Sequence, residues 1–496
     1  MPTLVAFLAI ALPWLNPFSL GPSPPVVPLL FSWTCAAVLL AVCSLTSARL
    51  QGGSLVRATA AAWLFAALLS SVLGLLQYFG ETTLFEPWIN HTAVGEAYAN
   101  LRQRNQFATL TNIGLAALLW WTAQAQLARS RWAVSAEGLG TMAVLLAMGN
   151  AASSSRTGLV QLLLLLLLAG AWGHWRLPAT RRVLLAAALA YSVAALALPF
   201  LLGLDLNDRG ILARLQDGGP SCASRLTLWA NVLHLIAQKP WLGWGWGELD
   251  YAHFITLYPG ARFCEILDNA HNLPLHLAVE LGLPVALLVC GGGLWLMARA
   301  KPWRERDSTR QLAWAVLAVV LLHSLLEYPL WYGPFQMALG LSLWLLWRPA
   351  VRQRPIFGRF SAAAPVLPAL TATILIAFSA AAAWDYRRIS QLYMAPSYRL
   401  AAYRENTLQK VSDAWLFQDQ VRFAELTTTP LMRNNAAHLN ELATALLHFS
   451  PEPRVAEKLI ESATLLARED EALFYLVRYQ AAFPENHARW AQKNAR

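Results

Sequence analysis

Residues 150–173 read NAASSSRTGLVQLLLLLLLAGAWG, a polar junction followed by an apolar run with seven consecutive leucines. Such a run is typical of a helix that crosses a bilayer, because about 20 apolar residues span the hydrocarbon core. The arginine in front of it, Arg156, needs water or an anion at the end of a span. An arginine that only snorkels to the interface is the alternative. The stretch therefore predicts a membrane fold and one functional residue.

The rest of the chain extends the same pattern. Of its 496 residues, 57% are hydrophobic and 13% are charged, about half the charged fraction of a soluble protein. This composition excludes an ordinary cytosolic enzyme. It predicts an all-α polytopic membrane protein with about eleven spans, expected at 3–20, 27–48, 58–79, 106–127, 136–152, 157–173, 183–203, 272–298, 311–332, 334–347 and 362–383.

The basic residues predict the orientation. Alternate loops between the expected spans carry 16 Lys and Arg residues against three acidic residues, and short basic loops tend to stay cytoplasmic. The amino terminus is then cytoplasmic and the carboxyl terminus lies across the membrane. The net charge of +10 is accordingly a topology signal, and nucleic acid is not an expected partner.

Two domains are expected. Residues 1–383 form the membrane domain, which includes a long translocated loop at 204–271, and residues 384–496 form a soluble domain on the same side of the membrane. Short amphipathic patterns in this tail, punctuated by prolines, predict helical hairpins. Such hairpins would fit a tetratricopeptide-like arrangement, although no 34-residue consensus recurs.

Basic residues on the translocated side gain nothing from the topology rule and need another explanation. Before the tail they are Arg102, Arg104, Arg156, Arg209, Arg214, Arg225, Lys239 and Arg262. In residues 98–106, arginines stand beside Asn and Gln, a mixture that suits hydrogen bonding to phosphate or sugar hydroxyls. An ordinary polar loop would look the same. Arg225 opens an expected amphipathic helix and, taken alone, is an unremarkable surface residue.

His271, at the expected mouth of the eighth span, is the main candidate for proton transfer, because histidine titrates near neutral pH. A structural histidine at a helix end is the alternative, and His276 and His323 are further candidates. No metal-ligand motif appears, so no bound metal is predicted. The glycines of residues 241–248 predict a tight loop that allows close backbone approach to a ligand.

Several motifs together resemble one superfamily. His271 and Asn272, followed after nine residues by Gly282, resemble the H-N-x9-G signature of bacterial O-antigen ligases and related glycan-transferring membrane proteins. Arg156 in Ser-Ser-Arg-x-Gly and Arg225 ahead of a Pro-x-x-Gly-x-Gly loop are similar to that superfamily. The segments 100–109 and 323–332 resemble the PglL type of bacterial protein O-oligosaccharyltransferase, whose fold is GT-C-like.

The resemblance implies a glycosyltransferase of the bacterial inner membrane with a periplasmic active site. The donor would be a glycan on undecaprenyl pyrophosphate, and the acceptor a Ser or Thr hydroxyl of a periplasmic protein such as a pilin. The family uses no nucleotide sugar, and neither a cofactor nor a metal is expected. The expected partners are therefore the lipid-linked glycan, the acceptor protein and the lipid bilayer.

Residue roles follow from the same resemblance. Arg156 and Arg225 would bind the pyrophosphate leaving group, and His271 would act as a general base or as a hydrogen-bond donor to a phosphate oxygen. Glu327 would lie near the catalytic mouth or acceptor channel, paired with one of the arginines. The substrate-binding set is Arg102, Gln103, Asn105, Gln106, Asn272, Glu327 and Tyr328.

A disulfide is expected independently of the family. Cys222 and Cys264 both fall in the long translocated loop, and an oxidising compartment would let them close a loop of about 40 residues, worth up to roughly 4 kcal/mol. The bridge would tether the Arg225 helix to the segment that leads into His271. Two unpaired cysteines are the alternative.

Three other functions remain open. An O-antigen ligase or polymerase would share the site and differ in its acceptor. A transporter or flippase would be expected to carry ionisable residues near span midpoints and internal repeats, which this sequence does not suggest. A scaffold that recruits partners through its tail would leave Arg156 and His271 without a role.

Overall fold

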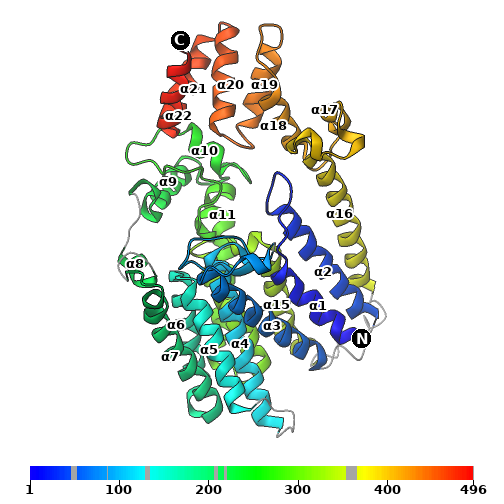
Figure 1. The fold of residues 1–496 in the computed structure, drawn as a ribbon, viewed down its shortest axis with the longest axis vertical. Coiled ribbons are helices and arrows are strands. Elements are labelled where there is room, and N and C mark those ends of the chain that lie inside the picture. Colours follow the sequence, from blue (N-terminus) through cyan, green and yellow to red (C-terminus); the bar gives the residue numbers. More distant parts are fainter. Residues whose placement is uncertain are drawn as a thin grey trace. The chain divides into compact units, whose positions relative to one another are not determined.

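The computed structural model describes residues 1–45, 53–86, 88–128, 135–205, 210–216, 221–352 and 366–494. Within these ranges every regular element is a helix, and strands are absent (Figure 1). The all-helical class predicted from hydropathy is confirmed. Arg49, Arg129, Arg131, Arg209, Arg354 and Arg359, which entered the charge argument, lie outside the described residues.

Each expected span falls on helical structure. The matching helices are α1 (Pro2–Leu15), α2 (Val26–Leu45), α3 (Gly53–Tyr78), α4 (Arg104–Ala128), α5 (Ala136–Ala152), α6 (Arg156–Ala171), α7 (Pro178–Leu201), α11 to α13 (Leu273–Leu281, Leu283–Ala286, Gly292–Ala300), α14 (Ser308–Ser324), α15 (Gly333–Arg352) and α16 (Val366–Ser390). Within the described part of the chain, five segments are long and apolar enough to cross a membrane: α2, α3, α7, Leu283–Arg304 and Val366–Tyr393. The chain is therefore a membrane protein, and the number eleven stays a prediction.

The eighth expected span differs from its prediction. A single span was expected over 272–298, but the helix stops at Gly282, which has φ 86° and ψ 162°, and the apolar segment starts again at Leu283. Only glycine adopts this backbone region readily, so the chain turns between α11 and α12. His271 consequently precedes a short separate helix and does not lie at the mouth of the span.

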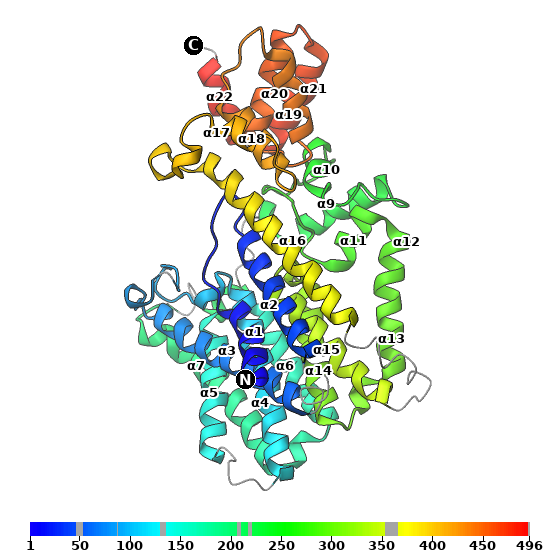
Figure 2. The ribbon, with the colours of Figure 1, turned by 90° about the vertical axis from the view of Figure 1, so that its right-hand side faces the viewer.

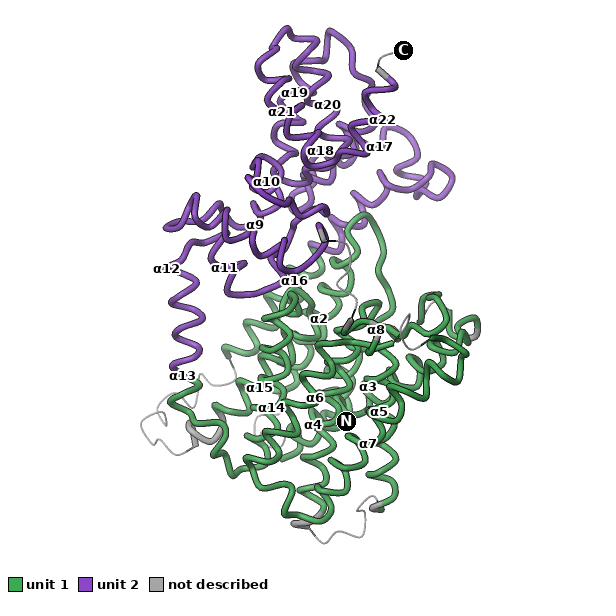
Figure 3. The backbone as a smooth tube through the Cα atoms, turned by 90° about the vertical axis from the view of Figure 1, so that its left-hand side faces the viewer, with its two compact units in different colours: residues 1–217, 297–381 green, residues 218–296, 382–496 purple. Residues whose placement is uncertain are grey.

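The chain forms two compact units (Figure 3). Unit 1 comprises Met1–Asp217 and Met297–Ala381, and unit 2 comprises Gly218–Leu296 and Ala382–Arg496. Most of the expected translocated loop thus groups with the carboxyl-terminal tail. Among the described residues, unit 1 has one large hydrophobic core, and unit 2 has two, one around the tail helices and one around residues 228–286.

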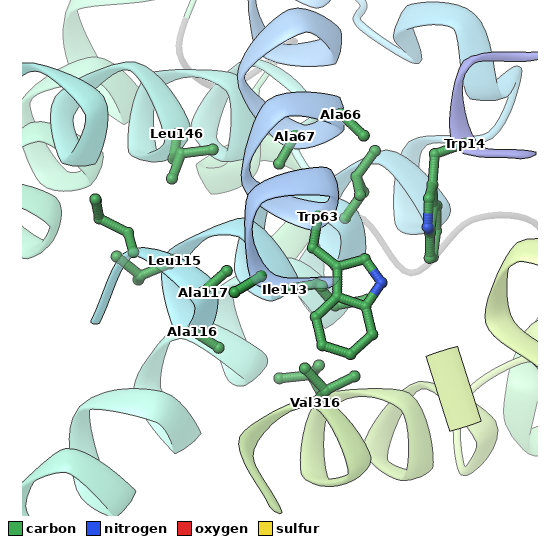
Figure 4. Close-up of a cluster of buried hydrophobic side chains, with 14 of the residues drawn as sticks. Trp14, Trp63, Ala66, Ala67, Ile113, Leu115, Ala116, Ala117, Leu146 and Val316 are labelled. Carbon is green, nitrogen blue, oxygen red and sulfur yellow. The ribbon is translucent and has the colours of Figure 1, made fainter. Parts of the chain in front are cut away.

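The core of unit 1 is a helical bundle in which small residues let helices approach closely, as in many membrane bundles. Trp63 of α3 is fully buried beside Val316 of α14 and the alanines of α3 and α4 (Figure 4). A Cβ on Gly114 of α4 would lie 2.4 Å from the Cβ of Ala67 on α3. The α3–α4 contact therefore depends on the absence of a side chain at residue 114.

The tail in unit 2 folds as the expected succession of amphipathic helices, each packed on the next: α18 (Gln418–Thr428), α19 (Ala436–Leu446), α20 (Pro453–Leu465), α21 (Glu469–Ala482) and α22 (Pro484–Asn494). Their core also takes in α10 (Leu249–Ile255) from the loop region. Phe254 of α10 is buried in that core, with its ring 6.4 Å from the ring of Phe483.

Candidate active site

The polar junction at the start of α6 is fixed to α4 by hydrogen bonds. Ser155 caps α6, because its Oγ accepts from the Gly158 amide at 2.9 Å, and the same hydroxyl donates to Asn105 Oδ1 at 2.5 Å. A Cβ on Gly158 would lie 2.3 Å from Asn150 Oδ1. The Ser-Ser-Arg-x-Gly pattern thus places Arg156 as the first residue of α6, with its side chain exposed.

Glu327 lies in the loop after α14 and is buried, with 8% of its surface exposed. Its carboxylate accepts hydrogen bonds from the side-chain amides of Gln103 and of Asn105, the latter at 2.5 Å. These residues flank the start of α4, where the helix dipole also favours a negative charge. The sequence predicted an arginine partner for Glu327. The structure adds two amide donors, together with an electrostatic interaction with Arg214.

A buried polar network continues from Glu327 into the bundle. The His323 Nε2 atom lies 3.5 Å from the Glu327 carboxylate, and its Nδ1 lies 3.0 Å from Thr109 Oγ1. Gln161 of α6 donates to Thr109 Oγ1 at 2.9 Å and to the Val319 carbonyl at 2.8 Å. The network links α4, α6 and α14 and so holds Glu327 and the Arg156 junction on one framework.

Three arginines gather at this end of unit 1. Arg214, on the short helix α8 (Ile211–Gln216), donates to the Ser154 carbonyl at 3.2 Å. Burial and the positive charges of Arg104 and Arg156 lower the pKa of Arg214 to about 10. An anion placed among these side chains would relieve that repulsion. No role for Arg214 was predicted from the sequence, although its place on the translocated side was a signal for it.

The remaining predicted residues of unit 1 have varied surroundings. Arg102 has a positive φ of 59° and donates to the Pro17 carbonyl at 2.5 Å, so part of its guanidinium is used inside the protein. Arg104 donates to the Tyr98 hydroxyl at 2.9 Å. Gln106 is buried, and Tyr328 stacks on Tyr332 with ring centroids 5.9 Å apart.

Unit 2 carries the other predicted residues. Arg225 is the first residue of α9 (Arg225–Gln238) and is exposed. His271 has a positive φ of 49°, and its amide donates to Asn269 Oδ1 at 2.9 Å. Asn272 caps α11 by accepting from the Leu275 amide at 3.1 Å. The structure therefore gives Asn272 a helix-capping role.

Several links join α9 to the segment leading into His271. The Trp229 indole donates to the Ala270 carbonyl at 3.1 Å. Asn231 accepts from the Phe263 amide at 2.8 Å and donates to the Ala261 carbonyl at 2.9 Å. Cys222 and Cys264 form a disulfide with their Cα atoms 5.4 Å apart. Arg225 and His271 thus lie at the ends of two segments that are cross-linked to each other within unit 2.

Within the glycine-rich loop 241–248, Gly243 allows close packing against the end of α11. A Cβ on Gly243 would lie 2.3 Å from the Glu280 carbonyl oxygen, and one on Gly282 would lie 2.1 Å from the Trp241 carbonyl oxygen. The Trp244 amide donates to the Val279 carbonyl at 2.8 Å. The close backbone approach at Gly243 is therefore to the end of α11. It also accounts for the glycine of the H-N-x9-G pattern.

Three protein families match successive parts of the chain. A family described as "Protein glycosylation ligase" matches residues 97–121, "O-Antigen ligase" matches 141–290, and "Virulence factor membrane-bound polymerase, C-terminal" matches 311–496. The first match contains the Glu327 amide partners and the second contains Arg156, Arg214, Arg225 and His271. The chain, all-helical in its described residues, is thus a membrane protein that is similar to the O-antigen ligases.

Individual relatives narrow the relationship. A general O-oligosaccharyltransferase of Acinetobacter baylyi is 26% identical over 56% of this chain and 48% of the relative. The ComP-specific O-oligosaccharyltransferase of the same organism is 26% identical over 50% of this chain and 43% of the relative. The matches thus span about half the length of these two proteins. An O-antigen ligase of Pseudomonas aeruginosa is 28% identical over 62% of this chain and 66% of the relative. Within the ligase superfamily, the chain fits the PglL type.

Proposed function

We propose that this protein is a glycosyltransferase that moves an oligosaccharide en bloc from undecaprenyl pyrophosphate to Ser or Thr hydroxyls of periplasmic proteins such as pilins. The observation that carries the proposal is the arginine group of unit 1, which a lipid pyrophosphate would neutralise. The matches to two O-oligosaccharyltransferases support the protein acceptor. In this arrangement the protein lies in the inner membrane with its amino terminus cytoplasmic and its site periplasmic.

The reaction exchanges one glycosidic bond for another. The bond between the anomeric carbon and the phosphate oxygen breaks, and a bond from that carbon to the acceptor oxygen forms. Arg156, Arg214 and Arg225 stabilise the charge that grows on the departing pyrophosphate, since guanidinium forks bind phosphate oxygens without losing a proton. The acceptor hydroxyl gives its proton to His271 or directly to the leaving group, in which case His271 donates to a phosphate oxygen.

The test is transfer in cells that make a lipid-linked glycan and a pilin, with the mass of the pilin as the readout. Wild-type protein should add the glycan mass, and Arg156→Ala, Arg225→Ala or His271→Ala should abolish the addition while the protein is still made. Arg422→Ala is the matched control, because Arg422 is an exposed arginine of α18 that pairs with Asp419. Transfer by all three site variants at the wild-type level would refute the assignment.

An O-antigen ligase activity is the second candidate, because the Pseudomonas relative bears that name. It would use the same donor chemistry and would hand the glycan to a lipid acceptor. Supplying both acceptors to the purified protein separates the two. Our proposal requires glycan on the pilin, and glycan on the lipid acceptor alone would overturn it.

We also propose that the transfer needs no metal ion, because fixed guanidinium charge replaces the cation that many glycosyltransferases place on a pyrophosphate. Among the described residues, no group of three or more His, Cys, Asp or Glu side chains is arranged to hold a metal. Transfer by the purified protein should continue at an unchanged rate in excess EDTA. Loss of transfer in EDTA, with recovery on adding Mg²⁺ or Mn²⁺, would contradict this part of the proposal.

A further inference from the structure

Helix α9 has apolar residues on two opposite faces. One face, with Leu228, Val232 and Leu235, is buried in the hydrophobic core that surrounds residues 228–286 of unit 2. The other carries Leu226 and Leu233, which are 77% and 55% exposed. Ala230 and Ala237, which share that stripe at helical spacing, are also exposed. A helix on the surface of a soluble domain would place polar residues there.

The exposed apolar surface continues beyond the end of the helix. Trp241 is 74% exposed and Leu242 is 86% exposed. Between the helix and these residues, the Lys239 ammonium lies over the ring of Trp244 at 4.0 Å. Aromatic side chains with an adjacent lysine are typical of the boundary between a bilayer and water. We call the set Leu226, Ala230, Leu233, Ala237, Trp241 and Leu242 the α9 apolar stripe.

Backbone contacts fix this stripe at the start of a candidate membrane span. The Leu283 amide donates to the Pro240 carbonyl at 2.8 Å, and the Gly245 amide donates to the Glu280 carbonyl at 3.0 Å. The span Leu283–Arg304 begins at that point. Figure 2 shows α9 and α11 beside the upper end of the rod formed by α12 and α13. Leu287 and Leu288, one turn into the span, are exposed as well.

We propose that the α9 apolar stripe lies in the headgroup region of the bilayer and that phospholipid covers it. The Trp241 end of the stripe lies at the first turn of a span, and the stripe presents leucine and tryptophan outward. Burying such side chains is worth about 25 cal/mol for each Å² removed from water. An amphipathic helix that is anchored in this way lies along the interface, with its apolar face among the upper acyl carbons.

The placement has a consequence for the reaction, and this step rests on the proposed function. Arg225 is the first residue of α9, so a helix held in the interface keeps its guanidinium at the depth of lipid phosphates. The pyrophosphate of a lipid-linked donor lies at that depth, because its polyprenyl tail is in the bilayer. The anchor would therefore set the height at which Arg225 meets the donor.

The test is photocrosslinking in nanodiscs made of phosphatidylethanolamine and phosphatidylglycerol, doped with undecaprenyl phosphate. The full-length protein carries p-benzoylphenylalanine in place of Leu226, Leu233 or Leu242, and in place of Gln238 as the control. Gln238 is exposed on a different side of the same helix. Irradiation should add phospholipid mass to peptides from the three stripe positions and not to the peptide from the control.

Each other outcome contradicts the proposal. Adducts with undecaprenyl phosphate alone would make the stripe a donor-tail groove, and adducts with a pilin alone would make it an acceptor surface. Equal phospholipid adducts at Gln238, or no adducts at Leu233 and Leu242, would show that the stripe is not anchored in the interface. Formation of the Cys222–Cys264 disulfide in every variant checks that unit 2 has folded.

A transfer assay tests the consequence for Arg225. Leu233→Asp should lower transfer in nanodiscs and leave transfer unchanged in detergent micelles, where no bilayer fixes the height of the helix. Equal losses in both media would overturn this consequence. If the wild-type protein transfers no glycan, the proposed function fails, while the crosslinking result still decides whether the stripe lies in the bilayer.

Discussion

Arg214 shows how a residue can matter through its neighbours. It donates to the Ser154 carbonyl, and burial beside Arg104 and Arg156 lowers its pKa to about 10. Holding positive charges together costs free energy, and binding of an anionic ligand between them would offset that cost. Hydropathy and charge counting placed Arg214 on the translocated side, but only the fold shows that it joins the Arg156 group.

A prediction follows for that residue. Arg214→Ala should lower kcat/KM for the lipid-linked donor by roughly 10- to 100-fold, since a hydrogen bond to a charged group is worth about 1.5–3 kcal/mol. Arg214→Lys should recover part of the loss, because it keeps the charge and loses the fork. Steady-state transfer rates at varied donor concentration measure both. Wild-type kcat/KM for Arg214→Ala would exclude it from the site.

The buried position of His253 predicts how the stability of unit 2 depends on pH. Its Nδ1 lies 2.8 Å from the Tyr258 hydroxyl and its Nε2 lies 3.1 Å from the Phe263 carbonyl. Burial and the nearby charge of Arg262 lower the pKa of His253 to about 3. The unfolded chain binds this proton near pH 6.5, so between about pH 6.5 and 3 it holds more protons than the folded chain.

Stability contributed by neutral His253 is therefore present above pH 6.5 and is lost as the pH falls toward 3. Thermal unfolding in detergent between pH 7.5 and 4.5 should show Tm falling with acid, and His253→Gln should flatten that slope. Each pKa unit of difference corresponds to about 1.4 kcal/mol. His438→Gln serves as the control, because His438 is an exposed histidine in α19. An unchanged slope in His253→Gln would contradict the assignment.

At the scale of elements, hydropathy located nearly every helix but missed the point at Gly282 where the eighth expected span is divided into two helices. The apolar residues before and after Gly282 average to one continuous span, whereas the backbone turns there with φ 86°. The break arises because Gly282 packs against the Trp241 carbonyl, a contact between segments about 40 residues apart. A pattern read along a window of neighbouring residues does not contain such a contact.

Gly282→Ala tests that packing. A Cβ there would lie 2.1 Å from a backbone oxygen, and alanine is strained at this φ, so the variant should lose roughly 2 kcal/mol of stability or more. Gly293→Ala in α13 is the matched control, because nothing lies within 4 Å of its Cβ position. Thermal unfolding of both proteins in the same detergent compares them. An equal Tm for the two variants would show that the turn tolerates a side chain.

The whole molecule was only partly predictable. The all-helical membrane class, the helical tail and the Arg156 junction followed from composition and local pattern. The division into units did not, because residues 218–296 group with the tail through contacts such as Phe254 with Phe483. The amide partners of Glu327 could not be predicted from the sequence either, because Gln103 and Asn105 precede it by more than 200 residues.

The disulfide gives a prediction for the stability of unit 2 as a whole. Cys222 and Cys264 enclose a sequence separation of 42 residues, for which the chain-entropy estimate is roughly 4 kcal/mol. Cys222→Ser should lower the Tm of unit 2 by several degrees, and dithiothreitol should shift the wild-type protein in the same direction. Cys290→Ser is the control, because Cys290 is free. Alkylation of both Cys222 and Cys264 without reductant would show that the bond does not form.

The burial of Phe254 among the tail helices also means that α10 is synthesised long before the residues that cover it. Its partner Phe483 is made about 230 residues later, which at 5–20 residues per second is a delay of roughly 10–45 s. Throughout that interval α10 has emerged from the ribosome without the surface that buries it. Nascent chains stalled before residue 450 should therefore recruit chaperones or proteases that the finished protein no longer attracts.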